Sequence, residues 1–236
     1  MPNHCDNSLW VVGKPRDVKK FLDASKNPNF GKKEETPDWK GEFHEDRREW
    51  RIFQGNYPCP PELVATQAIH HTDEKLQSAQ IEKEKANLKK YGFENWYDWC
   101  NARWGTKWGD YDTCLNSSGR DGAWFSFTTA WSPGTEGLEK ISSLHPELVF
   151  VNAYEEGGCD FIGCDVFYRG KTIHSGSGPF PSGPDDWDDD EQVEAHDLET
   201  NERREKWLKK AVSKLEKKSP YHAKKFKSLT RGGKDE

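Results

Sequence analysis

Apolar and aromatic positions are concentrated in the first 170 residues, and their densest stretch is FENWYDWCNARWGTKWGDYD, from Phe93 to Asp112. If this stretch is helical, its apolar side chains form one stripe along a single side of the helix. The stripe consists of Phe93, Trp96, Tyr97, Cys100 and Trp104. Gly105 predicts the end of the helix, because glycine readily adopts the left-handed conformation that follows helices. So large an aromatic face needs a cover. We therefore expect Trp96, Trp99 and Trp104 to pack on a sheet face formed by Trp124, Phe125, Phe127 and Trp131.

The rest of the chain divides into strands and helices by the same criterion. Alternation of apolar and polar positions predicts strands over about 4–12, 50–53, 123–131, 147–156 and 160–169. Helical spacing predicts helices over about 15–25, 72–91, 93–104 and 137–144, and from 193 to about 219. Thr72 is the expected N-cap of the second helix. Residues 26–48 are polar and contain Gly and Pro, which predicts a long loop or an insertion.

This order of elements predicts an α+β fold, in which helices pack on one face of a mainly antiparallel, ferredoxin-like sheet. We expect this domain to occupy residues 1–174, with a helical insertion at about 72–104. An acidic Gly/Pro linker follows at 175–192, and a basic tail, helical or disordered, at 193–236. Few apolar side chains connect this tail to the body. The sequence therefore predicts that residues 1–174 fold without it.

Charge is distributed unevenly along the chain. The net charge is −6, but residues 201–236 contain thirteen Lys/Arg against five Asp/Glu, which leaves −14 for residues 1–200. A body this acidic is not expected to bind a nucleic-acid backbone as a whole, while weak nucleic-acid contact by the basic tail stays open. No apolar run approaches the ~18 residues of a membrane span, and the N-terminus lacks the layout of a signal peptide. We therefore expect a cytosolic protein without a membrane partner.

Six cysteines stand at positions 5, 59, 100, 114, 159 and 164. They form no CxxC pair and match no zinc-binding spacing, so we expect free thiols and neither a cofactor nor a metal. A zinc site that uses Cys159, Cys164 and a distant histidine is the alternative.

Four segments together resemble a known family. They are MPNHCDN at the start, ENWYDWCNARWGTKWGDYD in the centre, FTTAWSPG, and Tyr154-Glu-Glu-Gly. The resemblance is to a phage- and plasmid-borne family with a YubB-like ferredoxin-type domain, and it covers roughly residues 1–170. It implies the same fold and an origin in a mobile genetic element, and it supplies no catalytic residues. His4 departs from the family pattern, where an aromatic residue such as Trp is expected.

Trp108 is the tryptophan of the central segment that the helical stripe does not explain. It lies between Gly105 and Gly109, and glycine-bounded loops on a rigid scaffold often carry binding residues. We therefore expect an exposed Trp108 at the centre of a binding site. The candidate binding residues are Arg103, Lys107, Trp108, Asp110, Tyr111 and Asp112.

The sequence contains no complete catalytic signature. Together with the implied mobile-element origin, this favours a non-catalytic protein that binds and modulates a host or defence protein in the cytosol of the host cell. The alternative is a small-ligand or nucleotide-handling enzyme with a carboxylate-lined pocket near Trp108. The acidic run 185–191 can be read as a linker or as a DNA-mimicking surface, and both readings stay open.

Overall fold

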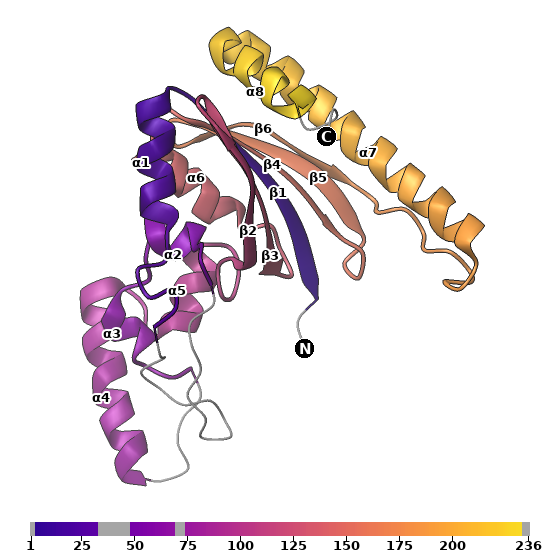
Figure 1. The fold of residues 1–236 in the computed structure, drawn as a ribbon. Helices are drawn as coiled ribbons and strands as arrows, with labels where there is room; N and C mark the ends of the chain where they lie inside the picture. Colours follow the sequence, from indigo (N-terminus) through magenta and orange to yellow (C-terminus); the bar gives the residue numbers. More distant parts are fainter. Residues whose placement is uncertain (1–2, 33–47, 69–73, 233–236) are drawn as a thin grey trace.

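The fold is seen in a computed structural model that describes residues 3–32, 48–68 and 74–232. The strands are β1 (His4–Val12), β2 (Tyr111–Gly119), β3 (Gly122–Ala130), β4 (Val149–Glu156), β5 (Phe161–Tyr168) and β6 (Lys171–Gly178). The helices are α1 (Pro15–Ser25), α2 (Ile52–Asn56), α3 (Pro61–Val64), α4 (Glu74–Tyr91), α5 (Trp96–Arg103), α6 (Thr135–Leu144), α7 (Asp190–Lys218) and α8 (Pro220–Gly232). The strands form one six-stranded sheet in the order β2-β3-β1-β4-β5-β6, and every neighbouring pair is antiparallel (Figure 1).

The sheet separates two hydrophobic cores because successive side chains of a strand point to opposite faces. On the central strand β1, Leu9 and Val11 belong to the first core, whereas Trp10 and Val12 belong to the second. Helices α1, α2, α5 and α6 cover the first core (Figure 1). Their buried contributions are Val18, Phe21, Ile52, Phe53, Trp99, Cys100, Leu138 and Ile141. The expected α+β, ferredoxin-like antiparallel sheet is thus confirmed.

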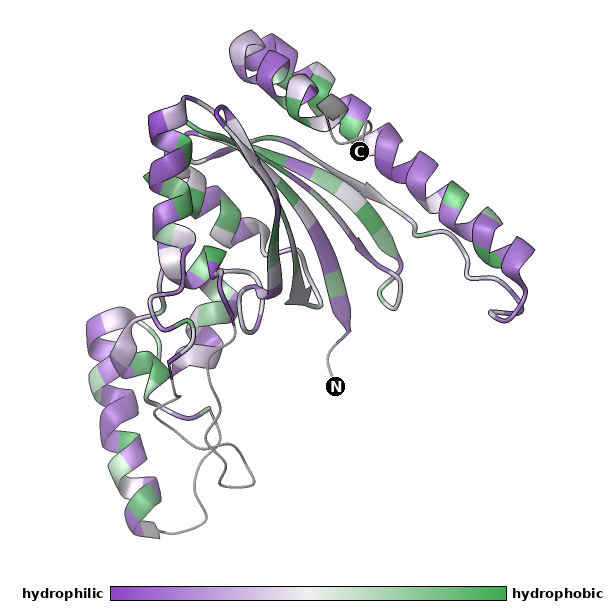
Figure 2. Cartoon of the chain, in the orientation of Figure 1, coloured by the Kyte–Doolittle hydropathy of each residue, from purple (hydrophilic) through white to green (hydrophobic). Residues whose placement is uncertain are grey.

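Helices α7 and α8 cover the opposite face of the sheet (Figure 1). Their completely or almost completely buried side chains are Ala211, Leu215, Ala223 and Phe226. The Phe226 ring packs edge-on against Trp10 at a centroid distance of 5.7 Å. The outward sides of both helices are largely hydrophilic (Figure 2). The expectation that few apolar side chains link the C-terminal segment to the body is therefore wrong, because these apolar side chains complete the second core on the sheet.

The boundaries of this C-terminal segment also differ from the expected ones. Strand β6 continues to Gly178, beyond the expected boundary at residue 175. Helix α7 begins at Asp190, and its N-cap Asp189 accepts hydrogen bonds from the backbone N–H groups of Glu191 and Gln192. An aspartate in this position satisfies N–H groups that have no partner within the helix. The acidic run thus contributes the N-cap and first turn of α7.

The strand expected over residues 50–53 is wrong, because Ile52–Asn56 form the short helix α2. The Asp110 carboxylate accepts hydrogen bonds from the backbone N–H groups of Ile52 and Phe53, at 2.8 and 2.7 Å. These contacts stabilise the start of a helix and come from a residue far away in the sequence, so a local pattern cannot reveal them. The edge strands β2 and β6 were not predicted, because both are polar and lack the alternation of a buried strand.

The packing expected for the central helix is correct in part. Trp99 and Trp104 are buried in the first core together with Phe125 and Phe127, whereas Trp96 is only partly buried at its border. The neighbouring Trp124 points to the other face of the sheet. Trp131 of the expected sheet face is exposed, and so is Tyr97 of the helical stripe. The expected N-cap Thr72 of α4 lies outside the described residues.

Candidate binding site

Four side chains form an exposed group at one end of the sheet, which we call the aromatic–lysine cluster: Tyr97, Lys107, Trp108 and Trp131. The three rings are 37%, 42% and 41% exposed. The Lys107 Nζ lies 4.6 Å from the Trp108 ring centre, 5.7 Å from that of Tyr97 and 5.8 Å from that of Trp131. An ammonium group at these distances is attracted by the electron-rich faces of the rings. One lysine thus gathers three aromatic side chains from three separate segments.

The loop that carries Lys107 and Trp108 follows α5 and is shaped by two glycines. Gly105 and Gly109 both have a φ of 73°, in the left-handed region that glycine enters without strain. A Cβ at Gly105 would overlap the Glu136 carboxylate, and a Cβ at Gly109 would lie 3.1 Å from the Trp104 ring. Any residue larger than glycine at position 105 or 109 would therefore strain the loop that carries Trp108.

Hydrogen bonds hold this loop to the end of β3. The Thr106 hydroxyl donates to the Ala130 carbonyl and accepts from the Ala130 N–H, both at 3.0 Å. The Ser132 hydroxyl donates to the Gly105 carbonyl. Trp131 has a φ of 64°, which is rare for a bulky residue, and its N–H donates to the Asn3 carbonyl at 3.1 Å. Hydrogen bonds from Thr106, Ser132 and Trp131 therefore hold the backbone that carries the cluster in place.

Tyr111, the first residue of β2, extends the cluster along the sheet edge. Its ring packs edge-on against Trp108 at a centroid distance of 6.2 Å. Its hydroxyl is hydrogen-bonded to Nδ1 of His4 at 2.8 Å. Partial burial, followed by the nearby charge of Asp112, raises the pKa of the Tyr111 hydroxyl. Tyr111 therefore remains a neutral hydrogen-bonding group, and it supports Trp108 from the side.

Asp110 has a structural task in this arrangement. Its carboxylate accepts hydrogen bonds from the backbone N–H groups of Ile52 and Phe53. It also accepts one from the Thr113 hydroxyl, at 2.7 Å. Burial of the carboxyl group raises the pKa of Asp110, although all three donors favour the ionised form. With its oxygens engaged by three donors, the carboxylate connects the Trp108 loop to α2.

The remaining two candidates point away from the aromatic–lysine cluster. The Arg103 guanidinium stacks over the Phe93 ring at 5.2 Å. Asp112, with a φ of 51°, lines a separate hollow of about 250 Å³ between the sheet and α7, together with Asp6, Thr128 and Arg204. The structure thus brings Lys107, Trp108 and Tyr111 together, and it places Arg103 and Asp112 at the periphery.

A second hollow, of about 240 Å³, adjoins Trp108 on the side of α2 and α5. It is lined by Arg48, Arg51, Gln54, Cys59, Val64, Trp96, Cys100, Trp104, Lys107, Trp108 and Asp110. Asp110 is the one acidic residue among the described residues that line this hollow. Its carboxylate oxygens already accept three hydrogen bonds. The lining is therefore aromatic and cationic in character rather than carboxylate-rich.

Sequence reasoning did not assign Tyr97 or Trp131 to the site. In α5 the N-cap Asn95 accepts from the Asp98 N–H at 3.1 Å, so Tyr97 lies in the first turn of a short helix and not within a long stripe. Trp131 comes one residue after the end of β3 and precedes Ser132-Pro-Gly. A large aromatic residue directly before a Ser-Pro-Gly turn is the signal that could have indicated its exposure.

The match to one family model supports the ferredoxin-like fold. Residues 103–199 match the family described as the ferredoxin-like domain in Api92-like protein. This segment runs from the end of α5 into α7 and covers less than half of the chain; it omits the central strand β1. Among solved structures, the chain is similar to protein api92 from Yersinia pseudotuberculosis, with 12% identity, a TM-score of 0.41, and coverage of 78% of this chain and 100% of that one. No curated protein matches the chain.

A helix able to span a membrane is not found in the part of the chain that is described. None of its helices combines the length and the apolar character that crossing a bilayer requires.

Proposed function

We propose that this chain is a non-catalytic binding protein and that the aromatic–lysine cluster is the centre of its partner-binding surface. The observation that carries the proposal is the exposure of three large aromatic rings around Lys107 on a firmly held loop. Exposed tryptophan and tyrosine are frequent hot spots of protein interfaces, because they offer a large contact area and lose little conformational entropy. A rigid backbone reduces the entropic cost of binding further.

The partner that we propose is a host or defence protein, encountered in the cytosol of a cell that carries a phage, prophage or plasmid. The support for this step is the sequence resemblance to a family of such elements. The mixed character of the surface also fits a protein partner, because apolar rings and one ammonium group suit a patch with apolar and acidic side chains.

Variant-dependent capture tests this proposal. Tagged wild-type protein and the variants Trp108→Ala and Trp131→Ala are incubated with host lysate, and the retained proteins are identified and quantified by mass spectrometry. We expect each variant to lose the specific partner by at least about tenfold, because removal of one hot-spot ring typically costs 2 kcal/mol or more.

Trp187→Ala is the matched control, because Trp187 is 65% exposed and lies far along the chain in the acidic segment before α7. It should retain the partner fully. Loss of the partner in Trp187→Ala alone would assign binding to the acidic segment. Equal capture by all variants would refute the proposed site.

The hollow beside Trp108 is the observation behind the second candidate, a small-ligand or nucleotide-handling enzyme. Trp96 and Trp108 could stack on a base, and Lys107 could face a phosphate. Its volume of about 240 Å³ is below the ~300–1,000 Å³ of typical ligand pockets, which favours the binding protein. Titration of tryptophan fluorescence with nucleotides separates the two candidates. Saturable quenching that disappears in Lys107→Gln would support the enzyme.

A further inference from the structure

We infer that α7 carries a binding stripe for the phosphate backbone of a nucleic acid, formed by Lys206, Lys210, Lys214 and Lys217. These lysines are separated by four, four and three residues, which places them on one side of the helix. All four are exposed. The buried side of the helix is marked by Ala211 and Leu215, so the stripe lies on a flank that is free to meet a partner.

The lysine stripe differs from the other flank of α7 in its lack of counter-ions. Among the described residues, no ion pair involves any of the four stripe lysines. The acidic residues in this half of the helix lie on the flank toward α8. There Glu205 pairs with Lys209 at 3.1 Å, and Glu216 pairs with Lys227 of α8. In this half of α7 the acidic residues thus lie on a different flank from the four stripe lysines.

The stripe runs beside β6, the edge strand of the sheet. Lys210 and Lys214 lie close enough to His174 of β6 to help lower its pKa, although burial is the larger cause. The Lys210 Nζ lies 4.0 Å from the ring centre of Trp207. Trp207 in turn packs so closely on Gly176 that a Cβ there would lie 2.7 Å from its ring. The sheet therefore holds this part of α7 in a fixed position.

The shape of the stripe favours a nucleic acid over a membrane surface. The eleven steps from Lys206 to Lys217 at 1.5 Å each give a line of cations about 16 Å long, which suits a linear chain of phosphates. A helix that lies on a membrane would in addition need an exposed apolar face. The apolar side of α7 is instead buried on the sheet. The charge of −14 on residues 1–200 disfavours contact of nucleic acid with the body, and the net positive charge lies in the C-terminal segment that contains the stripe.

Two triple variants of the full chain with the same loss of charge test this inference. Lys206→Gln/Lys214→Gln/Lys217→Gln removes most of the stripe and leaves Lys210 to cover Trp207. The control Lys209→Gln/Lys225→Gln/Lys227→Gln removes lysines that are paired with Glu205, Asp121 and Glu216. Binding to a fluorescein-labelled DNA duplex, and to the matching single strand, is measured by anisotropy over a range of salt concentrations.

We expect the stripe variant to bind DNA at least about tenfold more weakly at low salt, with a slope of log K against log salt shallower by about 2–3, because three phosphate contacts are lost. The control variant should retain most of the affinity and slope. Circular dichroism melts of both variants ensure that folded proteins are compared. Equal losses in the two variants would overturn the inference, as would the absence of DNA binding by the wild type. Binding to anionic phospholipid vesicles but not to DNA would overturn it in favour of a membrane surface.

Discussion

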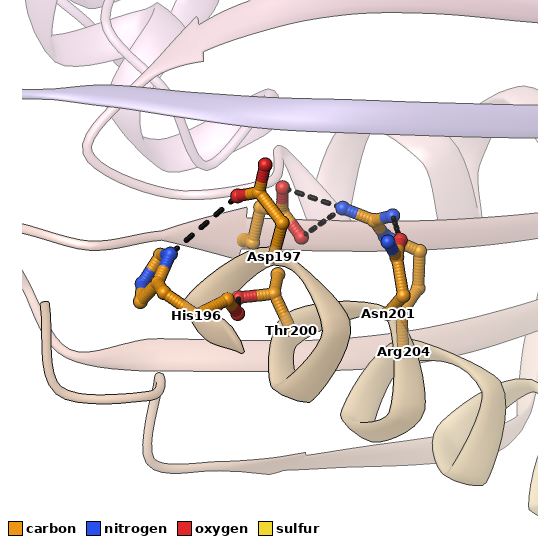
Figure 3. Close-up of polar contacts among 6 residues, drawn as sticks. His196, Asp197, Thr200, Asn201 and Arg204 are labelled. Carbon is orange, nitrogen blue, oxygen red and sulfur yellow. Dashed lines mark hydrogen bonds and ion pairs between the residues drawn. The ribbon is translucent and has the colours of Figure 1, made fainter. Parts of the chain in front are cut away.

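The Nη2 atom of Arg204 on α7 lies 2.7 and 2.6 Å from the two carboxylate oxygens of Glu155 on β4. Figure 3 shows the Arg204 side chain with dashed lines to these two oxygens, on the side chain drawn without a label. This ion pair connects the C-terminal helices to the centre of the sheet. Its side chains are 32% and 22% exposed, so water screens their attraction in part. We therefore expect Arg204→Gln to lower the free energy of unfolding by about 1 kcal/mol or less. Urea denaturation followed by circular dichroism measures the effect, and a loss several times larger would show that the pair is a main anchor of α7.

Apolar contacts of α7 should matter more than this ion pair. Leu215 is completely buried in the second core, and Leu215→Ala should lower the free energy of unfolding by about 2–5 kcal/mol. Leu198 provides a matched control on the same helix, because it is 61% exposed and its replacement by Ala should change stability by less than about 0.5 kcal/mol. Similar effects of the two substitutions would contradict the docking of α7 on the sheet.

Truncation tests the same docking on a larger scale. A chain that ends after Gly178 retains all six strands but exposes the second core, including Trp10, Val12 and Val151. We expect it to lose the cooperative thermal transition of the full chain, because an uncovered apolar sheet face cannot offset the conformational entropy of folding. A truncated protein that melts cooperatively near the temperature of the full chain would show that α7 and α8 are dispensable for folding.

Tryptophans of the central segment should separate into two classes. Trp99 is 5% exposed and packs on Trp104 at a centroid distance of 5.3 Å, so Trp99→Ala should cost about 3–5 kcal/mol of stability. Trp108 is 42% exposed, and Trp108→Ala should cost less than about 1 kcal/mol while weakening partner binding. Thermal melts of both variants, recorded alongside the capture assay, measure this difference. A large drop in the melting temperature of Trp108→Ala would identify it as a core residue.

The attachment of α8 should depend on pH through His222. This side chain is buried at the start of α8, where Nδ1 is hydrogen-bonded to the Ser219 hydroxyl at 2.6 Å and Nε2 to the Glu147 carbonyl at 3.0 Å. Burial lowers the pKa of His222 below its ordinary value of about 6.5. The unfolded chain therefore binds this proton at a higher pH than the folded chain does. The resulting contribution to stability is complete above pH 6.5 or so and is lost as the pH falls below it.

Denaturation curves between about pH 7 and pH 5 check this dependence. We expect the free energy of unfolding of the wild type to fall over this range and that of His222→Gln to fall less. The dependence should not vanish in the variant, because burial also lowers the pKa of His145 and of His174. Identical slopes for wild type and variant would rule out His222 as a contributor.

The sequence by itself determined the α+β class, the central strand β1 and the burial of Trp99 and Trp104. The class, β1 and the burial of Trp104 follow from periodicities that a strand or helix imposes on neighbouring residues, so a short window contains the information. The burial of Trp99 was expected although this residue stands off the helical stripe. The exposure of Trp108 was likewise readable, because two flanking glycines and a position off the helical stripe are local signals. The polar edge strands carry no such periodicity, and their positions became clear only from their hydrogen-bonded neighbours in the sheet.

Only the tertiary structure decided which residues share the site. Lys107 meets Trp131 because Thr106 is bonded to Ala130, and Asp110 starts α2 because the chain brings it to Ile52, 58 positions away in the sequence. Contacts between such distant positions depend on how the elements pack, and no local pattern encodes them. The same holds for α7: its thin apolar stripe resembles that of a solvated tail, and it becomes a core element because the sheet presents a second apolar face to cover.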